Sequence, residues 1–343
     1  MKKRRVESIR WHDGRLLLLD QRDLPTAENW VEMPGIEAIH GAISDLLIRG
    51  APAIGIAAAY GCVLAAAHRV ADTSAWHGDL DRLIEARPTA VNLRWAIERM
   101  RATVADGSTP GAALADLERA ACKIHSDDLA ANQEMARAGA SYLAPGSRVL
   151  THCNTGSLAT AGVGTALGVI VRAWHEGRLK SVHACETRPW LQGLRLTAWE
   201  LAREQVPCNM LVESAAASLL QAREIDWVIT GADRIAANGD VANKIGTLML
   251  AVLARHFGAR MMVVAPRSTV DPDTADGRQI QIEHRPADEI WSSAGIAGGL
   301  PGIGAFNPVF DVTPARLIDL IVTEGGVLRP PYEQAISGLF GAL

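Results

Sequence analysis

The second half of the chain alternates short apolar runs with segments of helical length, and this alternation limits the folds open to it more than any other feature. Such alternation is typical of βαβ units, in which helices join the strands of one parallel sheet. The turn-forming pair Pro145-Gly146 precedes the first run, so we expect an α/β parallel-sheet domain over residues 146–343. The predicted strands are Arg148-Val149-Leu150, Ser181-Val182-His183, Asn209-Met210-Leu211-Val212, Trp227-Val228-Ile229 and Met261-Met262-Val263-Val264.

The first half of the chain has a helical pattern instead. Apolar residues recur at three-and-four spacing near residues 35–48, 52–70, 89–105 and 112–143, with Pro and Gly between them. Before these segments, His12-Asp13-Gly14 separates two apolar runs, which indicates a β-hairpin. We therefore expect a small N-terminal helical domain with a short β-hairpin over residues 1–145. Near the other end, Pro314 to Ile321 is predicted as a helix with Thr313 as its cap.

Composition and charge argue against several classes of protein. Apolar residues make up 48% and charged residues 21%, which is typical of a folded globular protein. The formal net charge of −4 offers no basic surface for nucleic acid, and the run Lys2 to Arg5 is interpreted as a solvated tail. The most apolar segment, Ala51 to Ala67, is shorter than the ~20 residues of a membrane span, so we predict a buried helix and no membrane partner.

The cysteines and histidines predict neither a disulfide framework nor a metal site. Five cysteines are an odd number, and no two of them form a Cys-x-x-Cys pair. Reduced thiols in the cytoplasm are therefore expected. Because no two histidines have the spacing of helical metal ligands and no carboxylate-rich cluster occurs, we expect no required metal.

Polar clusters follow three of the predicted strands. They are His152-Cys153-Asn154-Thr155-Gly156, Glu186-Thr187-Arg188-Pro189 and Gly231-Ala232-Asp233-Arg234. Because parallel strands end at the same edge of a sheet, we expect the clusters to converge on one pocket. The third cluster opens what is predicted to be a long loop, which also contains Asn243 and Lys244. An amide and a cation beside Asp233 suit an anionic, hydroxyl-rich ligand such as a polyol phosphate.

Two residues of these clusters each have a structural and a functional interpretation. Cys153 is either a small buried apolar residue or a thiol whose chemistry is tuned by the amides of the following turn. Asp233 is either a carboxylate that caps a turn or pairs with Arg234, or one buried enough to stay protonated. Position alone leaves both interpretations open.

A candidate anion site lies in the first half of the chain, at Arg49-Gly50-Ala51-Pro52. Pro52 suits the first turn of a helix, so the backbone amides ahead of it could bind a phosphate, with Arg49 supplying charge. An ordinary entry from loop to helix is the alternative. Arg87, which precedes another predicted helix, is a weaker candidate of the same kind.

The glycines of Gly162-Val163-Gly164-Thr165-Ala166-Leu167-Gly168 imitate a dinucleotide-binding fingerprint. They lie too far beyond the predicted strand to turn a pyrophosphate onto a helix, so we interpret them as glycines of helix–sheet packing. We accordingly expect no cofactor. A nicotinamide dehydrogenase stays the alternative that this stretch keeps open.

Taken together, five motifs resemble those of the methylthioribose-1-phosphate isomerase family of methionine salvage. They are Arg49 to Gly55, Arg87 to Leu93, Thr151 to Asn154, Glu186 to Pro189 with Gln192-Gly193, and Gly231 to Gly239. The resemblance implies a Rossmann-like C-terminal domain, a homodimer, and a sugar phosphate as substrate. It also implies that Cys153 and Asp233 are the catalytic pair. The substrate-binding residues that it implies are Arg49, Gly50, Ala51, Arg87, Gln192, Asn243 and Lys244.

The chain departs from the family pattern at a few positions, among them Val163, Glu213-Ser214 and Gly325. These departures leave the breadth of substrate open, for instance toward 5-deoxyribose 1-phosphate or ribose 1,5-bisphosphate. The regulatory subunits of the translation-initiation guanine-nucleotide exchange factor share the fold but lack the pair Cys153 and Asp233. Its presence therefore favours an enzyme over a regulatory binding subunit.

The implied reaction assigns distinct tasks to the two residues. Phosphate on the anomeric oxygen blocks spontaneous ring opening, so Asp233 would protonate the ring oxygen, which requires a pKa above the usual ~3.9. Cys153 would then either act as base through an enediol or orient the substrate for a hydride shift. Both steps call for a closed, water-poor chamber between the two domains.

Overall fold

The computed structural model describes residues 6–87, 90–105 and 107–341, which fold into two compact units. The first unit comprises Met1–Gln133 with Gly156–Gly164, and the second comprises Glu134–Thr155 with Thr165–Leu343. The predicted tail Lys2 to Arg5, and Pro88 and Thr89 of the Arg87 motif, lie outside the described residues. The chain-order boundary at Pro145-Gly146 stays a prediction.

The first unit begins with a three-stranded antiparallel sheet in the order β1-β2-β3. The strands are β1 Ile9–His12, β2 Arg15–Leu19 and β3 Trp30–Met33. The predicted hairpin is confirmed, because Asp13 and Gly14 form its turn with φ of 50° and 72°, the left-handed pair that a two-residue hairpin needs. The third strand was not predicted. It pairs Met33 with Leu16 and so completes the small sheet.

The remaining elements of the first unit are helical. They are α1 Ile36–Ser44, α2 Ala51–His68, α3 Thr73–Glu85, α4 Val91–Arg101 and α5 Leu114–Ala140, the last of which continues into the second unit. Four of these helices match the predicted segments, and α3 was not predicted. The Asp72 side chain caps α3 by accepting a hydrogen bond from the N–H of Ala75 at 2.9 Å. Helix α2 is long and apolar enough to cross a bilayer, but 83% of it is buried within the structure, which confirms the predicted buried helix.

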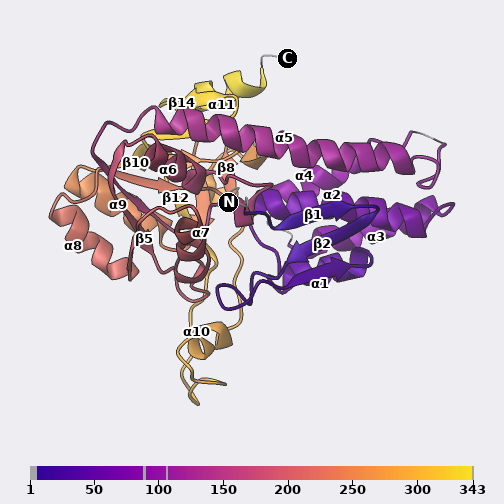
Figure 1. The fold of residues 1–343 in the computed structure, drawn as a ribbon, viewed down its shortest axis with the longest axis horizontal. Coiled ribbons are helices and arrows are strands. Elements are labelled where there is room, and N and C mark those ends of the chain that lie inside the picture. The colour runs from indigo at the N-terminus through magenta and orange to yellow at the C-terminus, as the bar shows by residue number, and fades with distance from the viewer. Residues whose placement is uncertain (1–5, 88–89, 106, 342–343) are drawn as a thin grey trace. The chain divides into compact units, whose positions relative to one another are not determined.

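The second unit is built on a seven-stranded sheet in the order β14-β13-β10-β7-β4-β5-β6, of which Figure 1 labels β5, β10 and β14. Its strands are β4 Ser147–Thr151, β5 Leu179–Cys185, β6 Asn209–Leu211, β7 Trp227–Thr230, β10 Arg260–Val264, β13 Leu320–Thr323 and β14 Gly326–Leu328. All neighbours run parallel except β13 and β14. The five predicted strands are confirmed, and so is the Rossmann-like order, in which the chain adds β5 and β6 on one side of β4 and then β7, β10 and β13 on the other.

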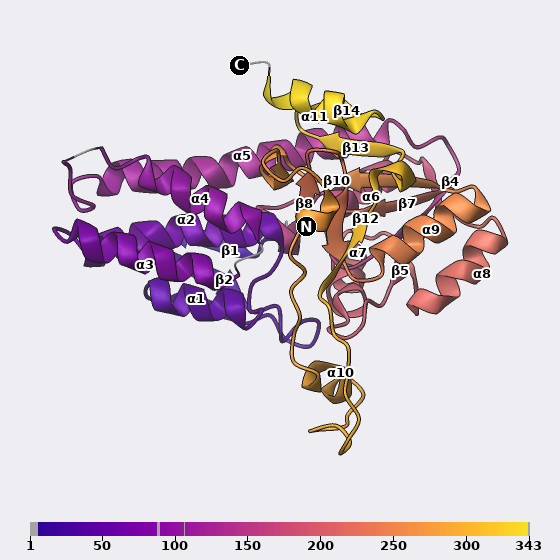
Figure 2. The same ribbon diagram turned by 180° about the vertical axis from the view of Figure 1, so that it is seen from behind.

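Helices cover this sheet as the alternation predicted. They are α6 Ala166–His175, α7 Ala198–Arg203, α8 Ala216–Gln221, α9 Thr247–Phe257 and α11 Tyr332–Phe340. Helix α6 packs on β4, β5 and β7, and α9 packs on β7 and β10. Figure 2 shows α8 and α9 lying side by side. Helix–sheet packing on Rossmann-like strands leaves the C-terminal strand ends free to carry polar residues.

The segment 230–247 was predicted as a long loop, and that prediction was wrong. It folds as an antiparallel hairpin of β8 Arg234–Ala236 and β9 Val241–Lys244, with Gly239 at a φ of 87° in the turn. The pair Asn238-Gly239 is a strong hairpin signal that the sequence did contain. With β11 Val270–Asp271 and β12 Phe310–Thr313 the hairpin forms a second sheet in the order β11-β8-β9-β12.

The predicted helix Pro314 to Ile321 is also wrong. The structure has a single 3-10 turn, Ala315–Leu317, followed directly by strand β13. Thr313 does not cap this turn; the N–H of Ala315 donates instead to the carboxylate of Asp240 at 2.8 Å. The run Leu320-Ile321-Val322 is rich in β-branched residues and too short for a buried helix, which explains why it enters the sheet.

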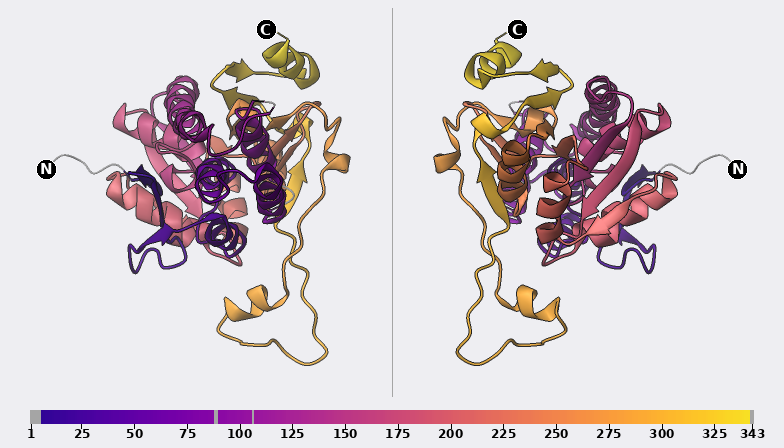
Figure 3. Two further views of the ribbon diagram at one scale, coloured as in Figure 1. Left: turned by 90° about the vertical axis from the view of Figure 1, so that its right-hand side faces the viewer. Right: turned by 90° about the vertical axis from the view of Figure 1, so that its left-hand side faces the viewer.

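An extended arm leaves the second unit between β11 and β12. Its two segments meet in an isolated bridge between His284 and Pro308, and it carries the short helix α10, Asp288–Ser292, away from the sheet (Figure 3). At the base of α10 the indole N–H of Trp190 donates to the carboxylate of Glu289 at 2.9 Å. The arm is thereby tied to the segment that follows β5.

Candidate active site

Cys153 and Asp233 follow the two strands at which the sheet reverses its order. Strand β4 pairs with β7 through Thr151 and Ile229, so the segments that begin at Cys153 and Gly231 leave neighbouring strand ends. A β-carbon at Gly231 would lie 2.9 Å from the Thr155 methyl carbon, which means that the two segments touch. In open α/β sheets, ligands bind at this reversal point. The predicted convergence of the first and third polar clusters is confirmed.

Cys153 is held in a backbone conformation that side chains other than glycine rarely adopt. Its φ is 60°, and its side chain is buried at 8% exposure. Two buried threonine hydroxyls fix this conformation. The N–H of Cys153 donates to Thr187 Oγ1 at 2.9 Å, and its carbonyl accepts from Thr197 Oγ1 at 2.6 Å. A left-handed non-glycine residue costs about 1–3 kcal/mol, and such strain clusters at functional sites.

The residue after Cys153 extends this network. The side-chain amide of Asn154 donates to Glu200 Oε1 at 2.8 Å and to Thr197 Oγ1 at 3.2 Å. Asn154 and Glu200 are both buried. Because the amide, the carboxylate and the hydroxyl are each occupied, the turn after β4 has little freedom to move. The thiol therefore has a fixed position at the end of the sheet.

Gln192 lies in a tight segment after β5. It follows the cis peptide bond Arg188-Pro189 and precedes Gly193, where a β-carbon would lie 1.7 Å from the carbonyl oxygen of Cys185. Only glycine fits at that point. The Gln192 side chain is 5% exposed, and its Oε1 has no hydrogen-bond partner among the described residues. A buried, unpartnered amide oxygen is the kind of acceptor that a hydroxyl-bearing ligand could satisfy.

Asp233 and Asn243 lie at the open end of the β8–β9 hairpin, before β8 and within β9. Arg234 pairs with Ala242, and the N–H of Asp233 donates to the carbonyl of Ala242 at 2.9 Å. The Asn243 side chain donates to Thr247 Oγ1 at 2.9 Å. Successive side chains of a strand leave on opposite faces, so Lys244 points away from Asn243. Its ammonium lies 5.0 Å from the centre of the Phe310 ring.

Asp311 fixes the turn that follows these residues. Its carboxylate accepts from the N–H groups of Gly246 at 2.7 Å and Leu248 at 3.0 Å, at the start of α9. Burial raises the pKa of Asp311 to about 6, although the two N–H bonds act in the opposite direction. Because β12 pairs Asp311 with Asn243, the carboxyl also anchors the strand that carries Asn243 and Lys244.

The other predicted site residues belong to the first unit. Gly50 caps α2 with a φ of 98°, and Pro52 occupies the first turn, as predicted. A β-carbon at Gly50 would lie 2.6 Å from atoms of Ala159, so glycine is required there for two reasons. Arg49 is 8% exposed, and Ala51 opens the helix. Arg87 lies between α3 and α4, beside residues outside the described ranges.

The glycine-rich stretch after β4 serves a different purpose from the one predicted. Gly162, Val163 and Gly164 have φ of 139°, 70° and 86° in an irregular loop ahead of α6. They supply backbone conformations that most residues cannot adopt, and they do not pack a helix on the sheet. The interpretation as packing glycines is therefore wrong for Gly162 and Gly164. The loop also lacks the tight strand-to-helix turn of a dinucleotide site.

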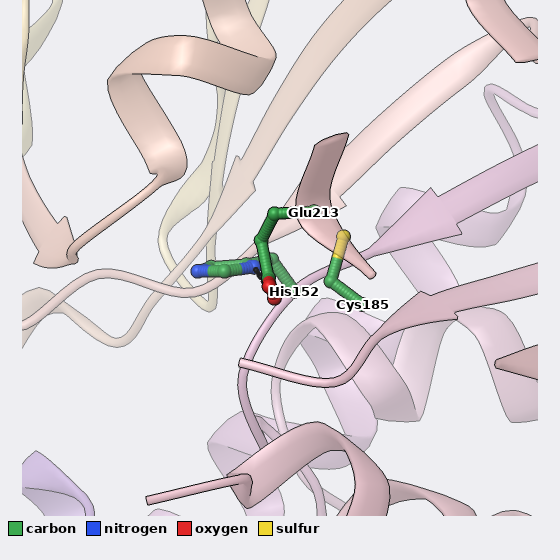
Figure 4. A group of neighbouring side chains, drawn as sticks. All are labelled: His152, Cys185 and Glu213. Atoms are coloured by element: carbon green, nitrogen blue, oxygen red, sulfur yellow. Dashed lines mark ion pairs between the residues drawn. The ribbon is translucent and has the colours of Figure 1, made fainter. Parts of the chain in front are cut away.

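One cluster of side chains escaped the sequence analysis. His152, Cys185 and Glu213 come from the ends of β4, β5 and β6 and face one another (Figure 4). Each residue looked isolated in the sequence because the three are brought together only by the order of the strands. The available signal was that each lies within two residues of the end of a predicted strand of one parallel sheet.

Comparisons with known proteins show what this chain is similar to. The family model described as the initiation factor 2 subunit family matches residues 47–330. A methylthioribose-1-phosphate isomerase from Thioalkalivibrio sulfidiphilus (strain HL-EbGR7) is 54% identical over 338 residues, which cover 97% of each chain. The solved structure of 5-methylthioribose 1-phosphate isomerase from Pyrococcus horikoshii OT3 has a TM-score of 0.88 and 38% identity, covering 98% of this chain and 96% of that one. Subunit delta of translation initiation factor eIF-2B from A. fulgidus has a TM-score of 0.83 and 38% identity, covering 97% and 99%.

Proposed function

The chain belongs to the initiation factor 2 subunit family and, within it, to the methylthioribose-1-phosphate isomerases, and on this premise we propose that Cys153 and Asp233 are its catalytic pair. The reaction is the aldose–ketose conversion of 5-methylthioribose 1-phosphate to 5-methylthioribulose 1-phosphate, a step of methionine salvage. The observation that carries the assignment is the place of both residues within three positions of the ends of β4 and β7, where the sheet reverses its order. Hydrogen moves within the substrate, so the reaction needs no external oxidant or reductant and no redox cofactor.

Ring opening is the first step that the protein has to assist. Phosphate on the anomeric oxygen prevents the spontaneous opening that free sugars undergo, so the ring oxygen needs a proton donor. Asp233 serves as this donor, which requires it to hold its proton above the usual pKa of ~3.9.

Hydrogen transfer from C2 to C1 is the second step, and Cys153 takes part in it. As a base, the thiolate would remove the C2 proton and form an enediol, which is then protonated at C1. In a hydride shift, the hydrogen would move directly and the thiol would orient the substrate. Turnover in deuterated water separates the two routes. Deuterium at C1 of the product supports the enediol, and its absence supports the hydride shift.

Substrate binding is assigned to the residues that the family resemblance implies. Arg49, Gly50, Ala51 and Arg87 bind the phosphate, since a buried arginine and the amides at the start of α2 form an anion site. Gln192, Asn243 and Lys244 bind the sugar and its oxygens. The unpartnered Oε1 of Gln192 suits a sugar hydroxyl, which can donate to it.

The experiment that tests the catalytic pair follows the conversion of 5-methylthioribose 1-phosphate by NMR with the purified full chain. We expect turnover by the unaltered protein and a loss of at least a hundredfold in Cys153→Ser and Asp233→Asn. Cys208→Ser, a thiol outside the site, serves as control. Undiminished turnover in Cys153→Ser would remove the thiol from the mechanism.

A second candidate function is that of a regulatory binding subunit without catalysis. The likeness to the eIF-2B subunit delta from A. fulgidus supports this alternative. The same NMR assay decides between the two, because a regulatory subunit would convert no sugar phosphate. Assays with 5-deoxyribose 1-phosphate and ribose 1,5-bisphosphate define the breadth of substrate through the ratio of kcat/KM values.

We also propose that the protein acts as a homodimer in the cytoplasm and binds neither nucleic acid nor membranes. The family likeness supports the dimer. All five cysteines are free thiols, which supports a reducing compartment. The net charge of −4 gives nucleic acid no electrostatic attraction. Analytical ultracentrifugation tests the dimer, since a single species of monomer mass would contradict it.

A further inference from the structure

His152, Cys185 and Glu213 form a compact set of three different donor atoms at one edge of the sheet in the second unit (Figure 4). One ring nitrogen, the thiol sulfur and a carboxylate oxygen all lie within 4.8 Å of one another. The three residues come from the adjacent strand ends of β4, β5 and β6. His152 and Cys185 are fully buried, and Glu213 is partly buried. The cluster is therefore held by three neighbouring strand ends of one sheet.

The orientation of His152 fixes which of its nitrogens can bind a ligand. Nε2 lies 2.8 Å from the carbonyl oxygen of Ile245. A carbonyl oxygen only accepts, so Nε2 carries the hydrogen and Nδ1 presents a lone pair. Burial lowers the pKa of His152 to about 4, which keeps the ring neutral near pH 7. A backbone carbonyl that accepts one ring N–H is the usual partner of a histidine whose other nitrogen binds a metal.

The lone pair of Nδ1 has nothing in the described ranges to bind. It is buried and makes no hydrogen bond there, and its nearest charged atom is Glu213 Oε1 at 3.9 Å. An unsatisfied buried nitrogen costs about 1–3 kcal/mol, so its presence calls for a reason. It points toward the sulfur of Cys185 and the carboxylate of Glu213, which are the other two donors.

The thiol and the carboxyl would both be stabilised in their charged forms by a nearby cation. Burial raises the pKa of the Cys185 thiol well above its ordinary range, and burial also raises the pKa of Glu213. A cation at the centre of the cluster would favour the thiolate and the carboxylate that burial disfavours. Glu213 Oε1 already accepts from the N–H of Thr187 at 2.5 Å, which aims the carboxylate.

We propose that His152 Nδ1, Cys185 Sγ and a carboxylate oxygen of Glu213 bind one zinc ion. Nitrogen, sulfur and oxygen donors together suit zinc better than magnesium or calcium, which prefer oxygen alone. A tetrahedral zinc ion spaces such donors about 3.3–3.8 Å apart, so the cluster has to contract slightly. Binding converts the Cys185 thiol to a thiolate and releases its proton to solvent. A water completes the fourth position.

Zinc at this site should slow the isomerase reaction, an effect that rests on the proposed function. His152 directly precedes Cys153 in the chain. Glu213 accepts from the N–H of Thr187, whose hydroxyl in turn accepts from the N–H of Cys153. Contraction around an ion would pull on both connections to the thiol.

Cobalt(II) titration of the reduced full chain tests the site independently of turnover. Cobalt takes the place of zinc and gives a near-ultraviolet thiolate band when sulfur is a ligand. We expect one cobalt per chain with this band, its displacement by equimolar zinc, and its loss in Cys185→Ser. Glu213→Gln should keep the band and weaken cobalt affinity by about tenfold or more. Circular dichroism confirms that each variant is folded.

Two control variants identify the sulfur. Cys153→Ser and Cys208→Ser should keep the cobalt band, since neither thiol belongs to the cluster. A band that survives in Cys185→Ser but disappears in Cys153→Ser would overturn the proposal, because the ion would then bind the catalytic thiol. No thiolate band at micromolar cobalt in the unaltered protein would overturn it as well. If Cys185→Ser does not fold, Glu213→Gln replaces it as the test, and unchanged cobalt affinity in that variant would overturn the proposal.

Discussion

The hydroxyl of Thr187 accepts a hydrogen bond from the backbone N–H of Cys153 across 2.9 Å. The same hydroxyl donates to the carbonyl of Cys185 at 3.3 Å, so one side chain connects the ends of β4 and β5. Cys153 owes its left-handed backbone to this contact and to its counterpart from Thr197. The position of the thiol is therefore determined by residues that need not touch the substrate.

Thr187→Val should lower kcat while leaving KM nearly unchanged. The substitution keeps the shape of the side chain but leaves the buried N–H of Cys153 without a partner, at a cost of about 1–3 kcal/mol. We expect kcat to fall about tenfold, because the thiol loses its fixed position. Thr187→Ser, which retains the hydroxyl, should restore most of the activity. Steady-state kinetics of the three proteins would contradict the positioning role if KM rose and kcat did not change.

Asp233→Asn should reduce kcat by about 10²–10⁴-fold, since the amide cannot give the ring oxygen a proton. In the unaltered protein, kcat/KM should fall as the pH rises through the pKa of Asp233, because the acid must be protonated to act. The residual activity of the variant should lack that decline. Asp116→Asn, on the exposed face of α5, serves as control. A variant with the same pH profile as the unaltered protein would assign the proton to another group.

Gly50→Ala should destabilise the first unit by about 2 kcal/mol or more. The new methyl group would lie 2.6 Å from Ala159, and the φ of 98° strains any residue with a β-carbon. Gly41→Ala is the matched control, because Gly41 lies in α1 with nothing within 4 Å of its β-carbon position. That substitution should be neutral or stabilising. Chemical denaturation of both variants provides the comparison, and equal midpoints would refute the steric argument.

Asp311 should make stability depend on pH between about 4 and 6. Burial raises its pKa in the folded protein to about 6, above the value of an exposed aspartate. Its contribution to stability is therefore fully present below ~3.9 and is lost as the pH rises through 6. Because one pKa unit corresponds to about 1.4 kcal/mol, the free energy of unfolding should fall by about 3 kcal/mol. Asp311→Asn cannot titrate, so the free energy of unfolding of the unaltered protein should fall relative to the variant between pH 4 and 7.

Most of the sheet could be predicted from the sequence because its strands are apolar on both faces. Trp227-Val228-Ile229 and Met261 to Val264 are short apolar runs without alternation, a pattern typical of a buried parallel strand. From such strands the edge that carries Cys153 and Asp233 followed directly. The first hairpin was equally clear, since Asp13-Gly14 defines its turn by local chemistry alone.

What the sequence analysis missed depends on neighbours that are distant in the chain. Leu320-Ile321-Val322 forms a strand because it pairs with the edge of β10. The sequence Thr313-Pro314 resembled a helix start, but it carries no information about that pairing. The cluster of His152, Cys185 and Glu213 depends on the order of three strands. By contrast, the hairpin at Asn238-Gly239 had a local signal in the sequence. We missed it because the whole segment was interpreted as a ligand-binding loop.

The return of Gly156–Gly164 to the first unit has a consequence for how this protein can be divided. Ala161 belongs to the apolar core of the first unit, and Leu158 accepts from the side chain of Gln21 at 2.8 Å. A fragment that stops at residue 145 would lack Leu158 and Ala161. A fragment that starts there would carry these residues without the core of the first unit in which they are buried. The segments before and after residue 145 therefore depend on each other. Recombination that replaces either segment with one from another protein would disrupt the core of the first unit.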